Sequence, residues 1–201
     1  MERMFVTFEG LDGSGKSTQA ELLRVRLQAD GVDVVSTREP GGTELGEGVR
    51  NLVLHGGDVG PWAEALLYVA ARAQLVDDVI RPALERGAAV ICDRYVDSSV
   101  AYQGIGRQLG LDRILDLNLA AVGGLLPDRT FLLELDPDEV ASRIQRHYDR
   151  LEREGDDFRR RAADGYRRLA ARFPERIVVL DAARPANDIA EEVYGALRVR
   201  S

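Results

Sequence analysis

The sequence predicts an α/β protein of three layers, in which a parallel β-sheet has helices on both faces. Short apolar and β-branched runs alternate with longer segments of helical periodicity along the 201 residues. The short runs show little polar alternation, which is typical of strands buried on both faces. The expected strands are residues 4–8, 32–36, 88–92, 130–135 and 177–180. The expected helices are residues 16–30, 44–54, 61–86, 111–122, 137–147, 153–172 and 186–198.

Length and composition favour a single domain over residues 1–201. The chain is long enough to bury a substantial core and short for two domains. Its fractions of 45% hydrophobic and 30% charged residues are ordinary for a globular protein. The formal net charge of −7 argues against nucleic acid as a partner. An anionic substrate would therefore have to be bound by a local cluster of arginines.

The chain carries no signal for a membrane or for secretion. No apolar run approaches the ~20 residues that span a bilayer. The first strand is expected almost at the start of the chain, which leaves no room for a signal peptide. We therefore expect a cytoplasmic protein with no membrane partner. The single Cys92 rules out an intramolecular disulfide, and its apolar neighbours predict a small core residue.

The first predicted strand leads into a glycine-rich turn and then a helix. In this turn, Gly10-x-x-x-x-Gly15-Lys16-Ser17 fits the P-loop pattern, in the context of strand and helix that the pattern demands. Glycines let successive backbone N–H groups curl around a phosphate, and the helix N-terminus adds its positive dipole end. Lys16 is the only lysine in the chain, which indicates that an ammonium group is needed here. A glycine-rich turn without a ligand is the alternative for this pattern by itself.

The loop predicts a site for a nucleoside triphosphate. Lys16 would reach the outer phosphates, while the Ser17 hydroxyl can ligate Mg²⁺. The expected ATP-binding residues of the loop are Gly10, Leu11, Asp12, Gly13, Ser14, Gly15, Lys16, Ser17 and Thr18.

Further candidates follow the later strands, where ligands sit in open parallel sheets. After the second strand, T-R-E-P-G-G-T (residues 37–43) makes a turn in which Arg38 can grip a second anion; a surface turn with a solvated ion pair is the alternative. After the third, Asp93 can hold Mg²⁺ or its water, and Arg94 can face phosphate. The alternative is that Asp93 and Arg94 only satisfy each other in the core.

Three motifs carry a resemblance to a known family. They are F-E-G-L-D-G-S-G-K-S-T-Q, T-R-E-P-G-G-T and D-R-Y-x-x-S-S-x-A-Y-Q-G. In this order and spacing, the chain resembles thymidylate kinase (dTMP kinase) of the bacterial type over nearly its whole length. The P-loop is shared by many families, but the other two motifs together are close to diagnostic.

The resemblance implies an activity and a fold. The activity is transfer of the γ-phosphoryl group of ATP to dTMP, giving dTDP. The implied fold is that of a P-loop NTPase with a five-stranded parallel sheet and a mobile lid, assembled as a homodimer. A P-loop kinase for another nucleotide or deoxynucleoside, and a nucleotide-binding protein without catalysis, are the competing readings.

The resemblance also assigns the dTMP site. Arg38 and Arg94 match arginines that hold the phosphate of dTMP, and Asp12 matches the carboxylate near the sugar 3′-hydroxyl, the acceptor phosphate and the metal. Tyr68 and Arg72 lie four apart on one helical face, where the family stacks an aromatic on thymine and bonds a ring carbonyl. By themselves, they would be read as a core residue and a solvated residue. The base and sugar pocket is assigned to Ser99, Tyr102 and Gln103, with Tyr102 screening against ribose.

The lid is expected at about residues 142–156. Relatives of the bacterial type lack an arginine at the P-loop position that Gly13 occupies and carry arginines in the lid. The resemblance therefore implies that the catalytic charge comes from Arg143, Arg146 or Arg150. Arg150 is favoured because D-R-L-E (residues 149–152) matches a family motif, which makes Lys16, Arg94, Arg150 and Asp12 the expected catalytic residues. Arg143 is expected to bind ATP, although Arg143 and Arg146 could equally be solvated helix charges.

Three more residues are expected near the nucleotides. Phe158 and Tyr166 should support the lid or the base pocket. Arg184, which follows the last strand, should contact the adenine of ATP. An ordinary turn before the final helix is the alternative for Arg184.

Overall fold

The computed structural model describes residues 3–143 and 150–198. Within these residues, five parallel strands form one sheet in the order β2-β3-β1-β4-β5, which confirms the predicted fold class. The strands are β1 (Phe5–Glu9), β2 (Val34–Arg38), β3 (Ala89–Asp93), β4 (Arg129–Glu134) and β5 (Ile177–Asp181). Their bounds lie within one or two residues of those expected.

The connections between the strands are helical. In chain order, the helices are α1 (Lys16–Ala29), α2 (Glu44–Arg50), η1 (Asn51–His55), α3 (Pro61–Leu75), η2 (Val76–Ile80), α4 (Arg81–Glu85), α5 (Val96–Ser99), η3 (Val100–Gly106), α6 (Leu111–Ala121), α7 (Pro137–Arg143), η4 (Glu152–Glu154), α8 (Asp156–Arg172) and α9 (Ala186–Arg198). The helix expected over 61–86 is the continuous run of α3, η2 and α4. The helical run of α5 and η3 was not expected.

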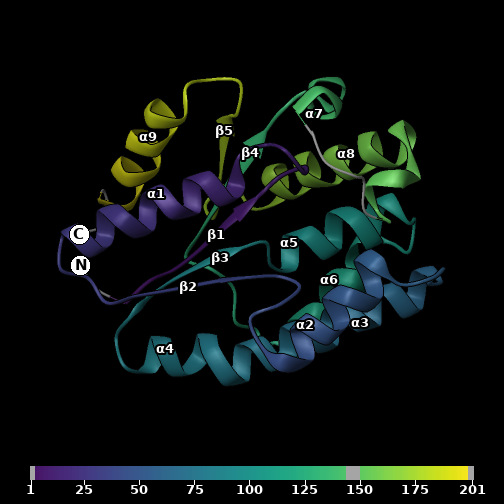
Figure 1. The fold of residues 1–201 in the computed structure, drawn as a ribbon, viewed down its shortest axis with the longest axis horizontal. Coiled ribbons are helices and arrows are strands. Elements are labelled where there is room, and N and C mark those ends of the chain that lie inside the picture. Colours follow the sequence, from purple (N-terminus) through teal and green to yellow (C-terminus); the bar gives the residue numbers. More distant parts are fainter. Residues whose placement is uncertain (1–2, 144–149, 199–201) are drawn as a thin grey trace.

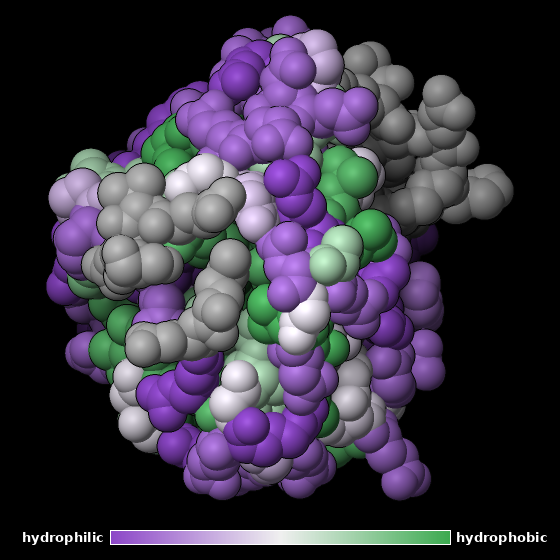
Figure 2. All heavy atoms as spheres, turned by 90° about the vertical axis from the view of Figure 1, so that its left-hand side faces the viewer, coloured by the Kyte–Doolittle hydropathy of each residue, from purple (hydrophilic) through white to green (hydrophobic). Residues whose placement is uncertain are grey.

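The helices cover both faces of the sheet. Helices α1 and α9 pack together on one face, while α4 and α8 contact strands from the other (Figure 1). The carboxyl ends of the central strands point into the middle of the molecule, between α1 and the layer of α2, α3 and α5. Hydrophilic side chains predominate on the opposite side, where the strands begin, with hydrophobic ones in small groups among them (Figure 2).

Two hydrophobic clusters hold the described structure together. The larger is centred on the sheet, where β1 is buried along its whole length and Phe8 stacks on Phe131 at 5.5 Å. Cys92 is buried there, as predicted. The smaller cluster lies between α2, η1 and α3 and consists of Val49, Val53, Leu54, Tyr68 and Ala71. Among the described residues, no helix has the length and apolar character needed to cross a membrane.

Candidate active site

The loop after β1 has the backbone that its glycines predict. Gly10, Gly13 and Gly15 have φ values of 136°, 79° and 94°, in the region that residues with a Cβ rarely adopt. A Cβ on Gly10 would also lie 2.5 Å from the carbonyl oxygen of Leu133 on β4. The loop therefore needs glycine for its conformation and, at Gly10, for its close approach to the sheet.

Lys16 begins α1 and lies over this loop. Its ammonium group donates to the carbonyl oxygen of Leu11 at 2.8 Å. Burial, and then the positive charge of Arg94, lower the pKa of Lys16 to about 8. The loop and Lys16 border a cavity of about 430 Å³, also lined by Arg38, Arg50 and Arg94. With Lys16, the cavity therefore has four cations beside a helix N-terminus, which is the arrangement that binds a polyphosphate. We call it the phosphate cavity.

The two predicted metal ligands are adjacent in the structure. The hydroxyl of Ser17, on the first turn of α1, donates to Asp93 Oδ2 at 2.5 Å. Asp93 ends β3, and both residues line the phosphate cavity. A hydroxyl and a carboxylate oxygen are donors that suit Mg²⁺, which takes oxygen ligands and keeps several waters when it binds phosphates.

Arg94 joins the phosphate loop to the following helix. Its guanidinium donates to Asp12 Oδ1 at 2.7 Å, to the Gly10 carbonyl at 3.1 Å and to Ser98 Oγ at 3.0 Å. Burial alone would favour a neutral side chain, but Asp12 and the nearby phenols outweigh it and keep the pKa of Arg94 well above its usual range. Its φ of 72° is strained for a residue with a side chain, as is common at functional sites.

Glu9 is a site residue that the sequence analysis missed. It is fully buried and accepts hydrogen bonds from the Tyr95 backbone N–H at 2.7 Å, from Ser98 Oγ at 2.6 Å and from Tyr166 Oη at 3.0 Å. Burial, and then the charge of Asp97, raise its pKa to about 7. Ser98 and Tyr166 both also accept from Arg94, so Glu9 orients the groups that hold this arginine. The signal that could have identified Glu9 in the sequence is a carboxylate at the end of an otherwise apolar strand.

A second cavity, which we call the acceptor pocket because it contains residues that the sequence analysis assigned to the acceptor site, adjoins the phosphate cavity. The two share Asp12, Glu39, Arg50 and Arg94. The second cavity is also lined by Tyr68, Ser99, Tyr102 and Gln103, all four of which the sequence analysis placed in the acceptor site. Two cavities that meet at a carboxylate and an arginine can bring a donor and an acceptor together end to end.

Tyr102 and the two predicted aromatic supports, Phe158 and Tyr166, lie close together near this junction. Tyr102 donates from Oη to Asp12 Oδ2 at 3.4 Å, and burial raises its pKa, so the phenol stays protonated. Its ring contacts those of Phe158 and Tyr166, with centroids 6.0 and 6.1 Å apart. Both partners come from α8, which thereby packs against the Tyr102 side of the second cavity.

Comparisons with known proteins decide the family. The family model described as thymidylate kinase matches residues 8–193. The chain belongs to the thymidylate kinase family. It is 52% identical over 207 residues to a thymidylate kinase of Clavibacter michiganensis subsp. michiganensis, covering 100% of this chain and 95% of the relative. A thymidylate kinase of Bifidobacterium longum is 52% identical over 189 residues, covering 92% of each chain.

A solved structure of the family shares the fold. The crystal structure of thymidylate kinase from Ehrlichia chaffeensis matches with a TM-score of 0.82 at 35% identity, covering 98% of this chain and 100% of that one. These comparisons confirm the resemblance inferred from the three motifs.

Arg72 lies under the acceptor pocket and does not line it in this structure. Its side chain is 1% exposed, so reading it from helical position alone as a solvated residue would be wrong. It donates to Glu39 Oε2 at 2.7 Å, to Ser99 Oγ at 2.9 Å and to the carbonyl oxygen of Tyr95 at 2.9 Å. It also bonds Asn118. Its contact with a thymine carbonyl stays a prediction.

The remaining predicted arginines have different surroundings. Arg38 lines the phosphate cavity, is half-exposed and donates to Glu47 at 2.9 Å. Arg184 forms an ion pair of 2.5 Å with Glu192 on α9, outside the cavities described above. Residues 144–149 of the expected lid, Arg146 among them, lie outside the described residues, as does the side chain of Arg143.

Arg150 is held away from the phosphate cavity. It is buried, donates from Nε to the carbonyl oxygen of Val53 at 2.8 Å and forms an ion pair with Glu64. Its backbone N–H donates to the carbonyl oxygen of Leu54 at 3.2 Å. The structure therefore places the favoured catalytic arginine against η1 and α3, and its catalytic role stays a prediction.

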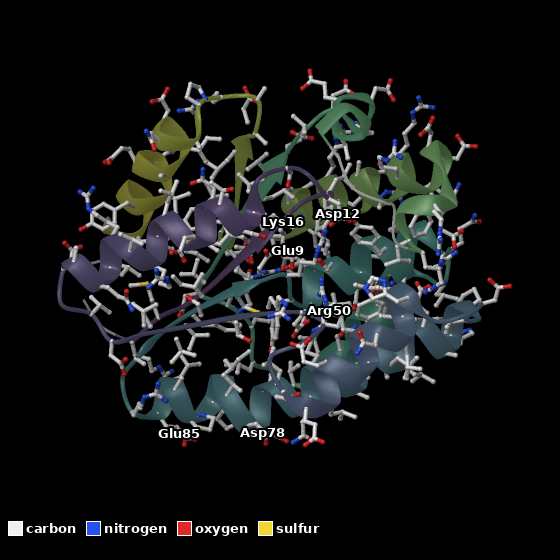
Figure 3. The ribbon with its side chains drawn as sticks, in the orientation of Figure 1. Glu9, Asp12, Lys16, Arg50, Asp78 and Glu85 are labelled. Atoms are coloured by element: carbon white, nitrogen blue, oxygen red, sulfur yellow. The ribbon has the colours of Figure 1, made fainter. Side chains whose placement is uncertain are left out.

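Arg50 is a second residue that the sequence analysis missed. It ends α2, lines both cavities and donates to the carbonyl oxygen of Pro40 at 3.1 Å. Figure 3 shows it facing Asp12 and Lys16 from the side of α2. In the sequence it is one of many arginines on helices, and no local signal distinguishes it.

Proposed function

We propose that this protein phosphorylates dTMP to dTDP with ATP as the donor. Membership of the thymidylate kinase family supports the reaction. The observation that carries it in the structure is the junction of Asp12 and Arg94, which closes the phosphate cavity on one side and the acceptor pocket on the other. A phosphoryl group can pass between two ligands that meet at such a point.

Catalysis would depend on alignment and charge, since phosphoryl transfer asks little covalent chemistry of the protein. Lys16 and the N-terminus of α1 would hold the phosphates of ATP, while Arg38 and Arg94 would hold the phosphate of dTMP. That phosphate has a second pKa of about 6, so it is largely ionised near neutral pH. No strong general base is needed. Asp12 would orient Arg94 and the sugar of dTMP.

We assign Mg²⁺ to Ser17 and Asp93, whose adjacent oxygens are suitable donors. When bound, the ion would neutralise charge that develops on the transferred phosphoryl group. Asp93 would hold it directly or through water.

The acceptor pocket would select thymine by stacking on Tyr68 and by polar contacts with Ser99 and Gln103, which line it. Arg72 would contact a ring carbonyl, and Tyr102 would exclude a ribose. For the lid of residues 142–156, we assign the catalytic charge to Arg150 and a contact with ATP to Arg143. Arg184 would contact the adenine.

We further propose that the enzyme is a cytoplasmic homodimer that binds neither nucleic acid nor membranes. Exposed apolar side chains on neighbouring elements support the dimer: Leu45 on α2, Leu52 on η1 and Trp62 and Leu66 on α3. Burying such a group against a second copy would remove it from water.

A coupled assay of ADP release tests the activity. ATP and Mg²⁺ are supplied with each nucleoside monophosphate in turn, and the expected result is turnover with dTMP well above that with dCMP, dGMP, AMP and UMP. Tight ATP binding without turnover on any of them would contradict the proposal and favour a nucleotide-binding protein. Preferred turnover on another monophosphate would assign a different kinase.

A further inference from the structure

Glu64 on α3 is a buried carboxylate that receives several donors from distant parts of the chain. It has no exposed surface. Its Oε1 accepts from Gln103 Nε2 at 2.9 Å and from Arg107 Nε at 3.2 Å. Its Oε2 accepts from an Arg107 amino group at 2.9 Å and from Arg150. The mechanism described above does not use it.

We propose that Glu64 is a positioning residue that orients the Gln103 amide to recognise thymine and couples this orientation to the position of Arg150. The inference rests on the proposed function and adds a residue that acts through others.

The orientation of Gln103 follows from donor and acceptor chemistry. A carboxylate accepts hydrogen bonds and donates none, so it selects the amide nitrogen of Gln103 as its partner. The amide oxygen is then the group that Gln103 can offer to the acceptor pocket, which this residue lines. Thymine carries a hydrogen on N3, whereas N3 of cytosine is an acceptor. An amide oxygen that faces N3 therefore accepts from thymine and is repelled by the lone pair of cytosine.

Glu64 also connects this amide to the end of the expected lid. Arg107 bridges from Glu64 to Glu154 at 2.6 Å and lies over the ring of Phe158, 4.8 Å from its centroid. Arg150 and Arg107 have side chains only 9% and 13% exposed. Without the charge of Glu64, two guanidinium groups would lie close together and nearly buried, which is unfavourable. The carboxylate thus anchors residues 150–154 to the base pocket.

Substituting Glu64→Gln tests the inference because it keeps the shape and adds a donor. The new amide can donate to Gln103 Oε1, which turns Gln103 Nε2 toward the pocket and favours cytosine. We expect kcat/KM for dTMP to fall about 10- to 100-fold, mainly through KM, as for a buried polar group left unpaired. Selectivity for dTMP over dCMP should fall at least as much, while the KM for ATP stays near that of the wild type.

Glu154→Gln is the matched control. Glu154 shares Arg107 with Glu64 but has no hydrogen bond with Gln103 among those of the described residues, and its side chain is 32% exposed. The same change there should leave the selectivity between dTMP and dCMP unaltered. Equal effects of the two substitutions would overturn the proposal, as would an E64Q protein that folds and keeps the wild-type selectivity.

Further measurements distinguish failure of this inference from failure of the proposed function and from loss of the fold. If E64Q does not fold, Glu64→Asp is the second variant. It keeps the charge but shortens the side chain, so the carboxylate cannot reach Gln103 and Arg150 together. The same loss of selectivity for dTMP over dCMP is expected, and wild-type selectivity would overturn the proposal. Absence of dTMP turnover by the wild-type protein would instead reject the proposed function. Thermal unfolding and ATP binding by each variant identify a protein that has only lost its fold.

Discussion

The phosphate-binding loop and the segment from Arg150 to Glu154 both carry cations expected in the active site, but they hold them differently. Lys16 donates to a carbonyl five residues away and lies where its helix begins. Arg150 is held by Glu64, 86 residues away, and does not line the phosphate cavity. A cation held by its own loop is in place before the ligand arrives. Arg150 would have to exchange a carboxylate for phosphates to act in catalysis.

Of the substitutions that test this difference between the two regions, Lys16→Met should have the largest effect on activity. Methionine is similar in length and tolerates burial, so the thermal midpoint should stay near that of the wild type. Transfer to dTMP should fall below detection, because the outer phosphates lose their ammonium partner. The assay is ADP release at saturating dTMP. A folded variant that retains activity would refute the assignment of the loop.

Arg150→Ala should have the next largest effect and decides what the second region does. If Arg150 leaves Glu64 for the phosphates, kcat should fall by ~10³ or more, with a much smaller rise in the KM for dTMP. Glu64 keeps Gln103 and Arg107 as donors, so the protein should still fold. Arg153→Ala, an exposed arginine of the same segment, is the matched control and should behave as wild type. A loss of dTMP affinity with intact kcat would confine Arg150 to a structural role on Glu64.

A pH profile should show a smaller effect that is specific to the loop. The pKa of Lys16 is lowered to about 8, so the free enzyme loses its ammonium group as the pH rises through this value. Because kcat/KM reports on the free enzyme, its value for ATP should decline by up to about tenfold per pH unit above pH 8. Bound phosphates favour the charged amine, so kcat should decline only at higher pH. A kcat/KM that stays flat to pH 10 would contradict this assignment, provided that circular dichroism shows a folded protein there.

The helical run from Val96 to Gly106 shows why part of the site was not predicted. Every residue from Val96 to Gly104 is buried, polar ones included, so the run has no solvent-exposed face and lacks the periodicity that indicates a surface helix. Its packing against α8 is close: a Cβ on Gly165 would lie 2.8 Å from the Cα atom of Ala101. The motif within this run identified the family, but only the fold revealed that it is a buried helix.

The sequence by itself determined the parallel sheet, the phosphate loop and the family. These depend on local physics: buried strands lack polar alternation, and three glycines with positive φ let a backbone surround phosphate. Tertiary structure alone decided the surroundings of Arg72 and Arg150, which bond carboxylates 33 and 86 residues away. It also revealed Glu9 and Glu64 as buried acceptors. A buried charge is stable only where oppositely charged or hydrogen-bonding partners compensate it. Here those partners come from other elements of the fold.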